Sequence, residues 1–151
     1  MDLADQLAQH AFCADMAPQV RERLAACARE ERFEAGAFLL RQNAPAMTFY
    51  LILEGQVEIK IAGTAVGHAP LETLGKDDAV GWSWFLPPYR WHFDAVARAP
   101  TRVLAFDAGC LRQAMQDDSA VGYAITRRLL EVVVQRLQAA RMQLSDLYGQ
   151  P

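Results

Sequence analysis

Apolar and polar positions repeat at helical spacing over the first 32 residues of the chain. Leu3 and Leu7 lie four positions apart, which predicts a short helix over Asp2–His10. Between Pro18 and Arg32, apolar residues share one face and charged residues lie around the other. A second helix is therefore expected over Pro18–Arg32.

From Phe33 onwards the pattern is typical of β-strands. Val57–Ile61 alternates strictly between apolar and polar residues, which predicts a strand with one buried face. Similar short runs, rich in β-branched and aromatic residues, are separated by glycines, as in all-β units. The other expected strands are Ala37–Gln42, Thr48–Leu53, Leu71–Leu74, Trp91–Ala97 and Arg102–Phe106. Glu54-Gly55 is expected to form a tight hairpin turn, because glycine accepts a positive φ. Further turns are expected at Ala35-Gly36, Ala62-Gly63 and Leu74-Gly75.

Helical spacing returns after Cys110. A short helix is expected over Leu111–Gln116, followed by a long one over about Ala120–Tyr148. Along the long helix, apolar positions alternate at spacings of four and three, which is the pattern of a coiled-coil seam. The seam comprises Thr126, Leu130, Val133, Leu137, Ala140, Leu144 and Leu147. A parallel homodimer through this helix is the favoured interpretation, and packing of the whole seam against the chain's own β-sheet is the alternative.

The order of these segments predicts an α+β fold that is mainly β. A chain of 151 residues is expected to form one domain with its own core. Short strands at regular spacing predict a rolled antiparallel sheet, a jelly-roll-like double-stranded β-helix. We therefore expect short N-terminal helices over 1–32, a β-roll over 33–109 and C-terminal helices, including the long one, over 110–151.

Composition and charge narrow the expected partners and location. The formal net charge of −3 provides no general attraction to nucleic acid, so direct DNA binding is not expected. No apolar run approaches the ~20 residues that cross a bilayer, and the acidic start lacks a signal segment. A cytoplasmic protein without membrane contact is expected. The cysteines Cys13, Cys27 and Cys110 are odd in number and widely spread, which favours reduced thiols and no metal site.

The segment from Ala79 to Asp94 carries the candidate chemistry. It holds all three tryptophans, a Pro-Pro pair and one arginine, which predicts a shaped loop between two strands. Gly81 and the amides that follow it can form an anion-binding nest, and Arg90 can add a charge-assisted bond to a phosphate. The indoles can stack on a base. The candidate ligand-binding residues are Gly81, Trp82, Ser83, Trp84, Arg90 and Trp91.

Two other interpretations of this loop need no ligand pocket. In the first, the aromatic residues plug the roll, and Arg90 caps a carbonyl or pairs with Asp94. In the second, Ser83, His92 and Asp94 form a hydrolytic triad. The triad is disfavoured, because the sequence after Gly81 lacks the second glycine of a nucleophile elbow. A catalytic role is therefore not expected.

The chain from about Phe33 to Phe106 resembles the cyclic nucleotide-binding domain of the Crp/Fnr superfamily, in a stand-alone form without a DNA-binding domain. The resemblance rests on the segments Glu34–Ala46, Phe49–Ile59 and Leu74–Gly81, including the run Tyr-Leu-Ile-Leu-Glu-Gly. It implies a β-roll, a phosphate-binding cassette between two strands, and a long helix used for dimerisation and signalling. It also implies a cyclic nucleotide, cAMP or cGMP, as the possible ligand.

The cassette departs from that family at two positions. The glycine that matches Gly81 is followed in the family by a ribose-binding glutamate, whereas this chain has Trp82. The nearest candidate for the family's phosphate-binding arginine is Arg90. Three functions stay open: a sensor of a phosphate-bearing nucleotide, a degenerate relative that dimerises and binds an effector protein, and a pocket for an apolar or haem-like ligand with His92 or Cys110 as axial ligand. The first is favoured.

Overall fold

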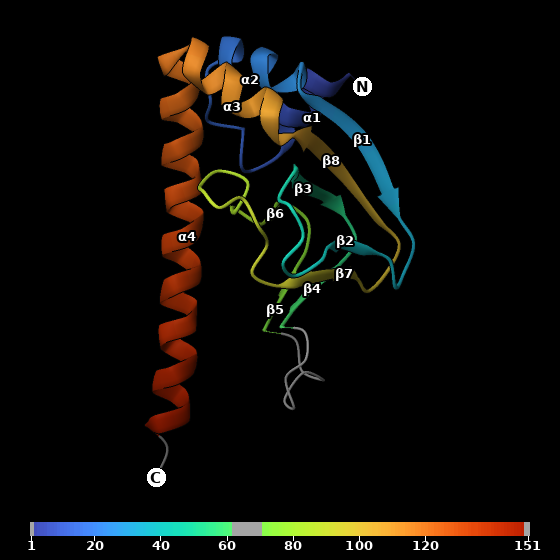
Figure 1. The fold of residues 1–151 in the computed structure, drawn as a ribbon, viewed down its shortest axis with the longest axis vertical. Helices are drawn as coiled ribbons and strands as arrows, with labels where there is room; N and C mark the ends of the chain where they lie inside the picture. Colours follow the sequence, from blue (N-terminus) through green and yellow to red (C-terminus); the bar gives the residue numbers. More distant parts are fainter. Residues whose placement is uncertain (1, 62–70, 150–151) are drawn as a thin grey trace.

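The computed structural model describes residues 2–61 and 71–149, and two four-stranded antiparallel sheets form its centre (Figure 1). The strand orders are β1-β8-β3-β6 and β2-β7-β4-β5. The strands are β1 (Ala28–Phe33), β2 (Phe38–Leu40), β3 (Thr48–Glu54), β4 (Val57–Lys60), β5 (Glu72–Leu74), β6 (Ala79–Val80), β7 (Asp94–Ala97) and β8 (Thr101–Asp107). The helices are α1 (Leu3–Gln9), α2 (Pro18–Ala25), α3 (Ala108–Asp117) and α4 (Ser119–Tyr148). The predicted class, with short N-terminal helices and a long C-terminal helix, is confirmed.

The core lies between the sheets and under the helices. In β8 the residues Val103–Phe106 are all buried, because the strand pairs with β1 on one side and β3 on the other while both of its faces are covered. Such a strand shows a continuous apolar run rather than alternation. The helices α1, α2 and α3 lie together at one end of the roll (Figure 1).

The predicted helix over Pro18–Arg32 is wrong in its second half. Helix α2 ends at Ala25, and Ala28–Phe33 forms β1, which pairs antiparallel with β8. The charged run of β1 is compatible with a helix locally, but the ladder with β8 supplies its hydrogen bonds. The roll therefore begins at Ala28 rather than at Phe33.

The turn at Glu54-Gly55 is present, but it is not a hairpin. Gly55 has a φ of 111°, and a Cβ there would lie 2.4 Å from Thr101 Oγ1. The strands on either side, β3 and β4, pair in different sheets, so Gly55 turns the chain from one sheet into the other. The predicted turn at Ala62-Gly63 lies outside the described residues.

The expectation that all three cysteines are reduced is wrong for two of them. Cys27 and Cys110 form a disulfide across a sequence separation of 83, which joins the start of β1 to α3. Only the fold brings these two residues together, because no short spacing marks them as a pair. Cys13 is a free, buried thiol, and burial raises its pKa to about 12.

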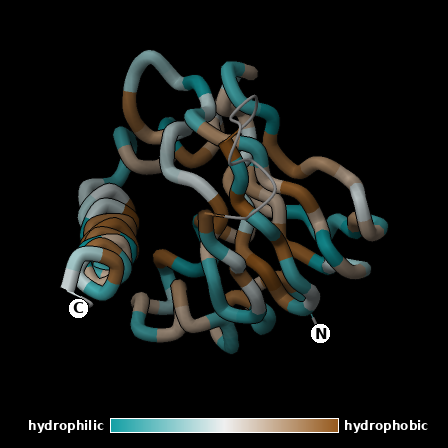
Figure 2. Tube along the Cα trace, turned by 90° about the horizontal axis from the view of Figure 1, so that it is seen from below, coloured by the Kyte–Doolittle hydropathy of each residue, from teal (hydrophilic) through white to brown (hydrophobic). Residues whose placement is uncertain are grey.

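Helix α4 packs on the rest of the molecule through one face near its start. Val121, Ile125, Leu129 and Val132 are buried on that face. The predicted seam lies elsewhere: Val133 is half-buried, and the other six seam residues are exposed. Packing of the whole seam against the chain's own roll is therefore wrong. The helix stands beside the roll, and its C-terminal part extends beyond it (Figures 1 and 2).

Candidate functional site

The predicted loop connects β6 to β7, as the sequence indicated. It begins at Gly81 with a φ of 81°, then forms a tight turn in which the Phe85 amide donates to the Trp82 carbonyl at 3.0 Å. A cis peptide bond joins Pro87 to Pro88 near its exposed tip. The loop therefore consists of a hydrogen-bonded turn after Gly81 followed by the proline pair at its tip.

The Trp91 ring lies directly against the backbone of Gly81. A Cβ placed on Gly81 would lie 2.4 Å from Trp91 Cζ3, so no residue with a side chain fits there without moving the ring. Trp91 is only 3% exposed, and its amide donates to the Ala44 carbonyl at 3.1 Å. The protein's own indole thereby fills the space on the side-chain face of Gly81.

Trp84 is fully buried in the core. Its ring centroid lies 5.2 Å from that of Phe49, and Phe85 packs edge-on against it at 5.7 Å. Ser83, just before it, is also buried. Trp84 and Trp91 therefore pack as core residues, which is the geometry of the interpretation in which aromatic residues plug the roll.

Arg90 lies on the surface, whereas Gly81 and Ser83 are buried. Its Nη1 donates to the Asn43 carbonyl at 2.9 Å, so the guanidinium caps a neighbouring turn. Asp94 accepts from the Gln42 amide at 2.7 Å rather than pairing with Arg90. A ligand-binding role for Gly81, Trp82, Ser83, Trp84, Arg90 and Trp91 stays a prediction.

Trp82 is half-buried, and a residue of α4 contacts its ring. The guanidinium carbon of Arg136 lies 5.1 Å from the Trp82 ring centroid. Arg136 also donates to the Ala79 carbonyl, and its Nε lies 3.7 Å from Glu72 Oε1. The side chain is only 14% exposed, and this burial lowers the pKa of Arg136, while the Glu72 and Asp78 carboxylates act in the opposite direction.

Arg136 is not among the residues predicted for the site. The signal available for it was its place on α4, four residues after Val132 on the face that packs against the roll. A cation that continues a buried apolar stripe needs an acceptor or an aromatic ring nearby. Which acceptor and which ring it meets depends on the fold.

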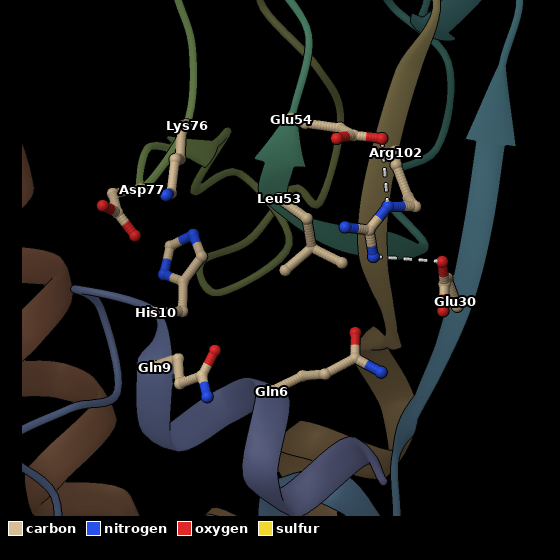
Figure 3. Close-up of a pocket in the computed structure, with 9 residues that line it drawn as sticks. All are labelled: Gln6, Gln9, His10, Glu30, Leu53, Glu54, Lys76, Asp77 and Arg102. Atoms are coloured by element: carbon tan, nitrogen blue, oxygen red, sulfur yellow. Dashed lines mark hydrogen bonds and ion pairs between the residues drawn. The ribbon is translucent and has the colours of Figure 1, made fainter. Parts of the chain in front are cut away.

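A polar cleft lies away from this loop. It has a volume of about 570 Å³ and is bordered by α1, β1, β3, β8 and the turn at Lys76-Asp77 (Figure 3). Arg102 bonds Glu54 and Glu30 on one wall, and these hydrogen bonds raise the pKa of Arg102. Among the side chains shown there, Glu30, Glu54 and Arg102 are bonded to one another, and none of the nine belongs to the predicted ligand site.

The sequence also matches a known protein family. The sequence profile of the family described as "Cyclic nucleotide-binding domain" matches residues 30–118. The chain belongs to this family. The matched segment includes the whole cassette loop from Gly81 to Phe93, so the departures at Trp82 and Arg90 occur within a cyclic nucleotide-binding domain.

Solved structures share the fold beyond the matched segment. A protein of Geobacter metallireducens described as cyclic nucleotide-binding has a TM-score of 0.81 at 23% identity, covering 91% of this chain and 99% of its own. The sensor domain of the transcriptional regulator DNR from Pseudomonas aeruginosa has a TM-score of 0.68 at 22% identity, covering 88% and 94%. The regulatory domain of Toxoplasma gondii PKA, solved with cAMP, has a TM-score of 0.68 at 18% identity, covering 85% and 49%.

These structural similarities, at such low identity, show the fold alone, and no curated protein matches the chain in sequence. They confirm the predicted β-roll of the cyclic nucleotide-binding domain. Within residues 2–61 and 71–149, no group of three or more His, Cys, Asp or Glu side chains is placed to hold a metal ion. In the same part of the chain, no helix is long and apolar enough to span a bilayer.

Proposed function

We propose that this cyclic nucleotide-binding domain is a non-catalytic, homodimeric regulatory module whose cassette is closed by its own side chains. The observation that carries the proposal is the Trp91 ring on the Gly81 backbone. The sequence favours a nucleotide sensor, whereas the packing of the loop supports the degenerate relative that dimerises and binds an effector protein.

The free energy of packing opposes entry of a nucleotide. A ligand that enters on the side-chain face of Gly81 must displace the buried Trp91 ring, and burial of one large apolar side chain contributes about 1.5–3 kcal/mol. That energy alone lowers ligand affinity by about 10- to 150-fold. Trp82, at the position of the family's ribose-binding glutamate, has no charged acceptor for a sugar hydroxyl, and its ring already contacts Arg136.

The dimer is supported by the two faces of α4. The buried residues of the helix and its exposed seam lie on different faces, so packing on the roll leaves the seam accessible. Leu130, Leu137, Leu144 and Leu147 are each about half exposed or more. A second copy of this chain offers the same seam, so the partner that fits it is another α4.

A nucleotide sensor is the second candidate, and one observation favours it. A crevice of about 260 Å³ lies between α4 and the β5–β6 region, and both Arg128 and Arg136 line it. Two guanidinium groups suit a phosphate, whereas Glu72, Asp77 and Asp78, which line the same crevice, oppose it. The similar domain solved with cAMP makes a cyclic nucleotide the first ligand to test.

The two candidates differ in the effect of nucleotides on thermal stability. With 1 mM cAMP, cGMP or a cyclic dinucleotide, we expect no change in Tm by differential scanning fluorimetry and no change in tryptophan fluorescence. A ligand with a Kd of about 10 µM would add about 2.7 kcal/mol at that concentration, which raises Tm by roughly 5–10 °C. A saturable shift of this size would overturn the proposal. Loss of the shift in Arg90→Ala or Arg136→Gln would then locate the site at the loop tip or in the α4 crevice.

A further inference from the structure

A groove of about 240 Å³ lies beside β2 and shares no residue with the polar cleft or with the α4 crevice. All three residues of β2 line it, and the connection to β3 contributes Ala44, Pro45 and Met47. The buried side chains of Tyr50 and Trp91 also line it. The lining of the groove is therefore mainly apolar and aromatic.

Two large apolar side chains of this groove are open to solvent. Met47 is 69% exposed and Phe38 is 37% exposed. Neither belongs to α4, so a second copy that pairs through the seam of α4 leaves both uncovered. A partner that covers them removes apolar surface from water, which favours association.

The backbone of β2 can accept a further strand on its outer edge. In the order β2-β7-β4-β5, β2 is terminal, and among the described strands it pairs only with β7. A terminal strand presents unpaired N–H and C=O groups on its free side, and an extended peptide can pair with them. Because the residues of β2 also line the groove, this arrangement favours an extended chain over a compact small molecule.

The charges beside the groove favour an acidic partner. The guanidinium carbon of Arg41 lies 3.9 Å from the centroid of the Phe38 ring, and Arg41 lines the groove. Arg90 is joined by an isolated antiparallel bridge to Pro45, which also lines it. In the described part of the chain, neither arginine forms an ion pair with a carboxylate. Both guanidinium groups therefore suit the carboxylates of a partner.

The carboxylates near the groove already have partners. Asp94 accepts from the Gln42 amide at 2.7 Å, and Glu31 pairs with Arg29 at 3.3 Å. Their negative charge is directed to groups of the roll itself. The cations beside the groove thus dominate the electrostatic attraction that a docking segment meets.

We propose that the groove beside β2 binds an extended segment of the effector protein, with apolar residues at alternate positions and acidic residues on either side of them. The inference rests on the effector-binding role proposed above and names the surface and the chemistry that this role uses. The segment pairs with the free edge of β2, and its apolar side chains contact Met47 and Phe38. Its carboxylates meet Arg41 and Arg90.

A peptide titration of the full chain, with amide chemical shifts followed by NMR, tests the groove. The probe is acetyl-Glu-Glu-Leu-Thr-Phe-Glu-Glu-amide, within a set that varies its two apolar residues among Val, Leu, Met, Phe, Tyr and Trp. At about 1 mM, at least one member of the set is expected to shift the amides of β2 and of residues 44–48 saturably. The counterpart with lysine in place of glutamate is expected to shift none of them.

Two pairs of matched variants separate the groove from the rest of the surface. Arg41→Glu is expected to weaken the acidic peptide about five- to tenfold and to strengthen the lysine peptide. Lys76→Glu makes the same change of charge in an exposed turn beside the polar cleft, and it should alter neither. Met47→Asp is expected to weaken the acidic peptide at least about tenfold, because it removes an apolar contact and adds a like charge. Met142→Asp, which is 64% exposed on α4, should have no effect.

Several results would overturn the inference: no shift with any member of the set, shifts outside the groove only, or equal affinity for the acidic and lysine peptides. So would a dimer that is weakened by Met47→Asp and not by Met142→Asp, because the groove would then bind a second copy. These results leave the closed cassette and the seam dimer intact. A rise in Tm with a nucleotide would instead overturn the proposed function, whatever the peptides do.

Discussion

The contact between Gly81 and Trp91 determines how the side chains of the cassette loop pack. The positive φ of Gly81 and the ring against its α-carbon both require a residue without a side chain. Composition alone indicated that the loop is unusually aromatic. Which indoles turn inward depends on the neighbours that receive them, Phe49 for Trp84 and Gly81 for Trp91.

His10 is a second residue whose surroundings determine its chemistry. It is buried, its Nδ1 accepts from the Phe12 amide at 3.0 Å, and its Nε2 lies 3.0 Å from the Ile52 carbonyl. A neutral ring with its proton on Nε2 satisfies both contacts. Burial lowers the pKa of His10, and the Asp77 carboxylate partly offsets this effect.

The lowered pKa of His10 predicts a pH-dependent stability. The unfolded chain takes up a proton near pH 6.5, whereas the folded chain does so only at lower pH. The His10 contribution is therefore complete above about pH 7 and is lost as the pH falls below 6.5, with a slope of at most about 1.4 kcal/mol per pH unit. Urea unfolding between pH 7.5 and 5 measures it. His10→Gln should flatten the curve, while His92→Gln, at an exposed position, should not; equal slopes in all three proteins would contradict the prediction.

At the scale of elements, pairing outweighs local propensity in the segment after α2. The residues Ala28–Phe33 include four charged side chains that favour helix as readily as strand. They form an edge strand because the backbone groups on one side of β8 are available for pairing. The disulfide Cys27–Cys110 ties the start of this strand to α3. Disulfides persist mainly in oxidising compartments, so this bond weighs against the predicted cytoplasmic location, which stays a prediction.

The disulfide is expected to contribute measurably to stability. It closes a loop with a sequence separation of 83, and removal of such a cross-link costs about 2–5 kcal/mol in free energy of unfolding. Urea unfolding with and without dithiothreitol should show this loss. The double variant Cys27→Ser/Cys110→Ser should be insensitive to the reductant. Thiol titration of the denatured protein should find one free thiol, Cys13, and a count of three before reduction would show that the bond does not form.

In the molecule as a whole, α4 carries one face that packs on the roll and a second face, the exposed seam, that we propose for a second copy. With Leu130, Leu137 and Leu144 at the a positions of the heptad, the buried residues of α4 lie at c, f and g and its exposed apolar seam at a and d, so the two faces are separate. Figure 1 shows the last turns of the helix extending past the strands of the roll. The dimer and the roll are thus expected to respond separately to surface substitutions on α4.

A charge at the seam is expected to separate the dimer without unfolding the roll. Leu137, at an a position, is 49% exposed in the single chain, so Leu137→Asp should change the free energy of unfolding of the monomer by no more than about 0.5 kcal/mol. In the dimer the same carboxylate is buried, which should weaken association by at least about 100-fold. Met142→Asp, on the same helix but off the seam and 64% exposed, is the matched control. The dimer dissociation constant is measured by sedimentation velocity. A change that is equal in both variants, or absent from both, would contradict the assigned interface.

The sequence alone determined the elements whose pattern is local. The strand β4, the turns at Gly36 and Gly75, the long helix with its seam, and the resemblance to a cyclic nucleotide-binding domain were all visible in it. The polar face predicted for β4 was wrong at Glu58, which is buried and pairs with Lys60 and Arg98. Two strands were not predicted from the sequence, for physical reasons. Strand β6 has only two residues, which are too few to show an alternating pattern, and β1 is a strand only because it pairs with β8.

The candidate site was likewise determined in part by the sequence and in part by the tertiary structure. The sequence located the loop from Gly81 to Trp91, because its aromatic residues, prolines and single arginine are crowded into one segment. Only the tertiary structure decided that Trp91 covers Gly81, that Arg90 caps a surface carbonyl and that Arg136 reaches Trp82. The periodicity of a sequence indicates which way a side chain points relative to its own helix or strand. These contacts instead join residues as far as 54 positions apart, as from Trp82 to Arg136, and depend on how separate elements pack.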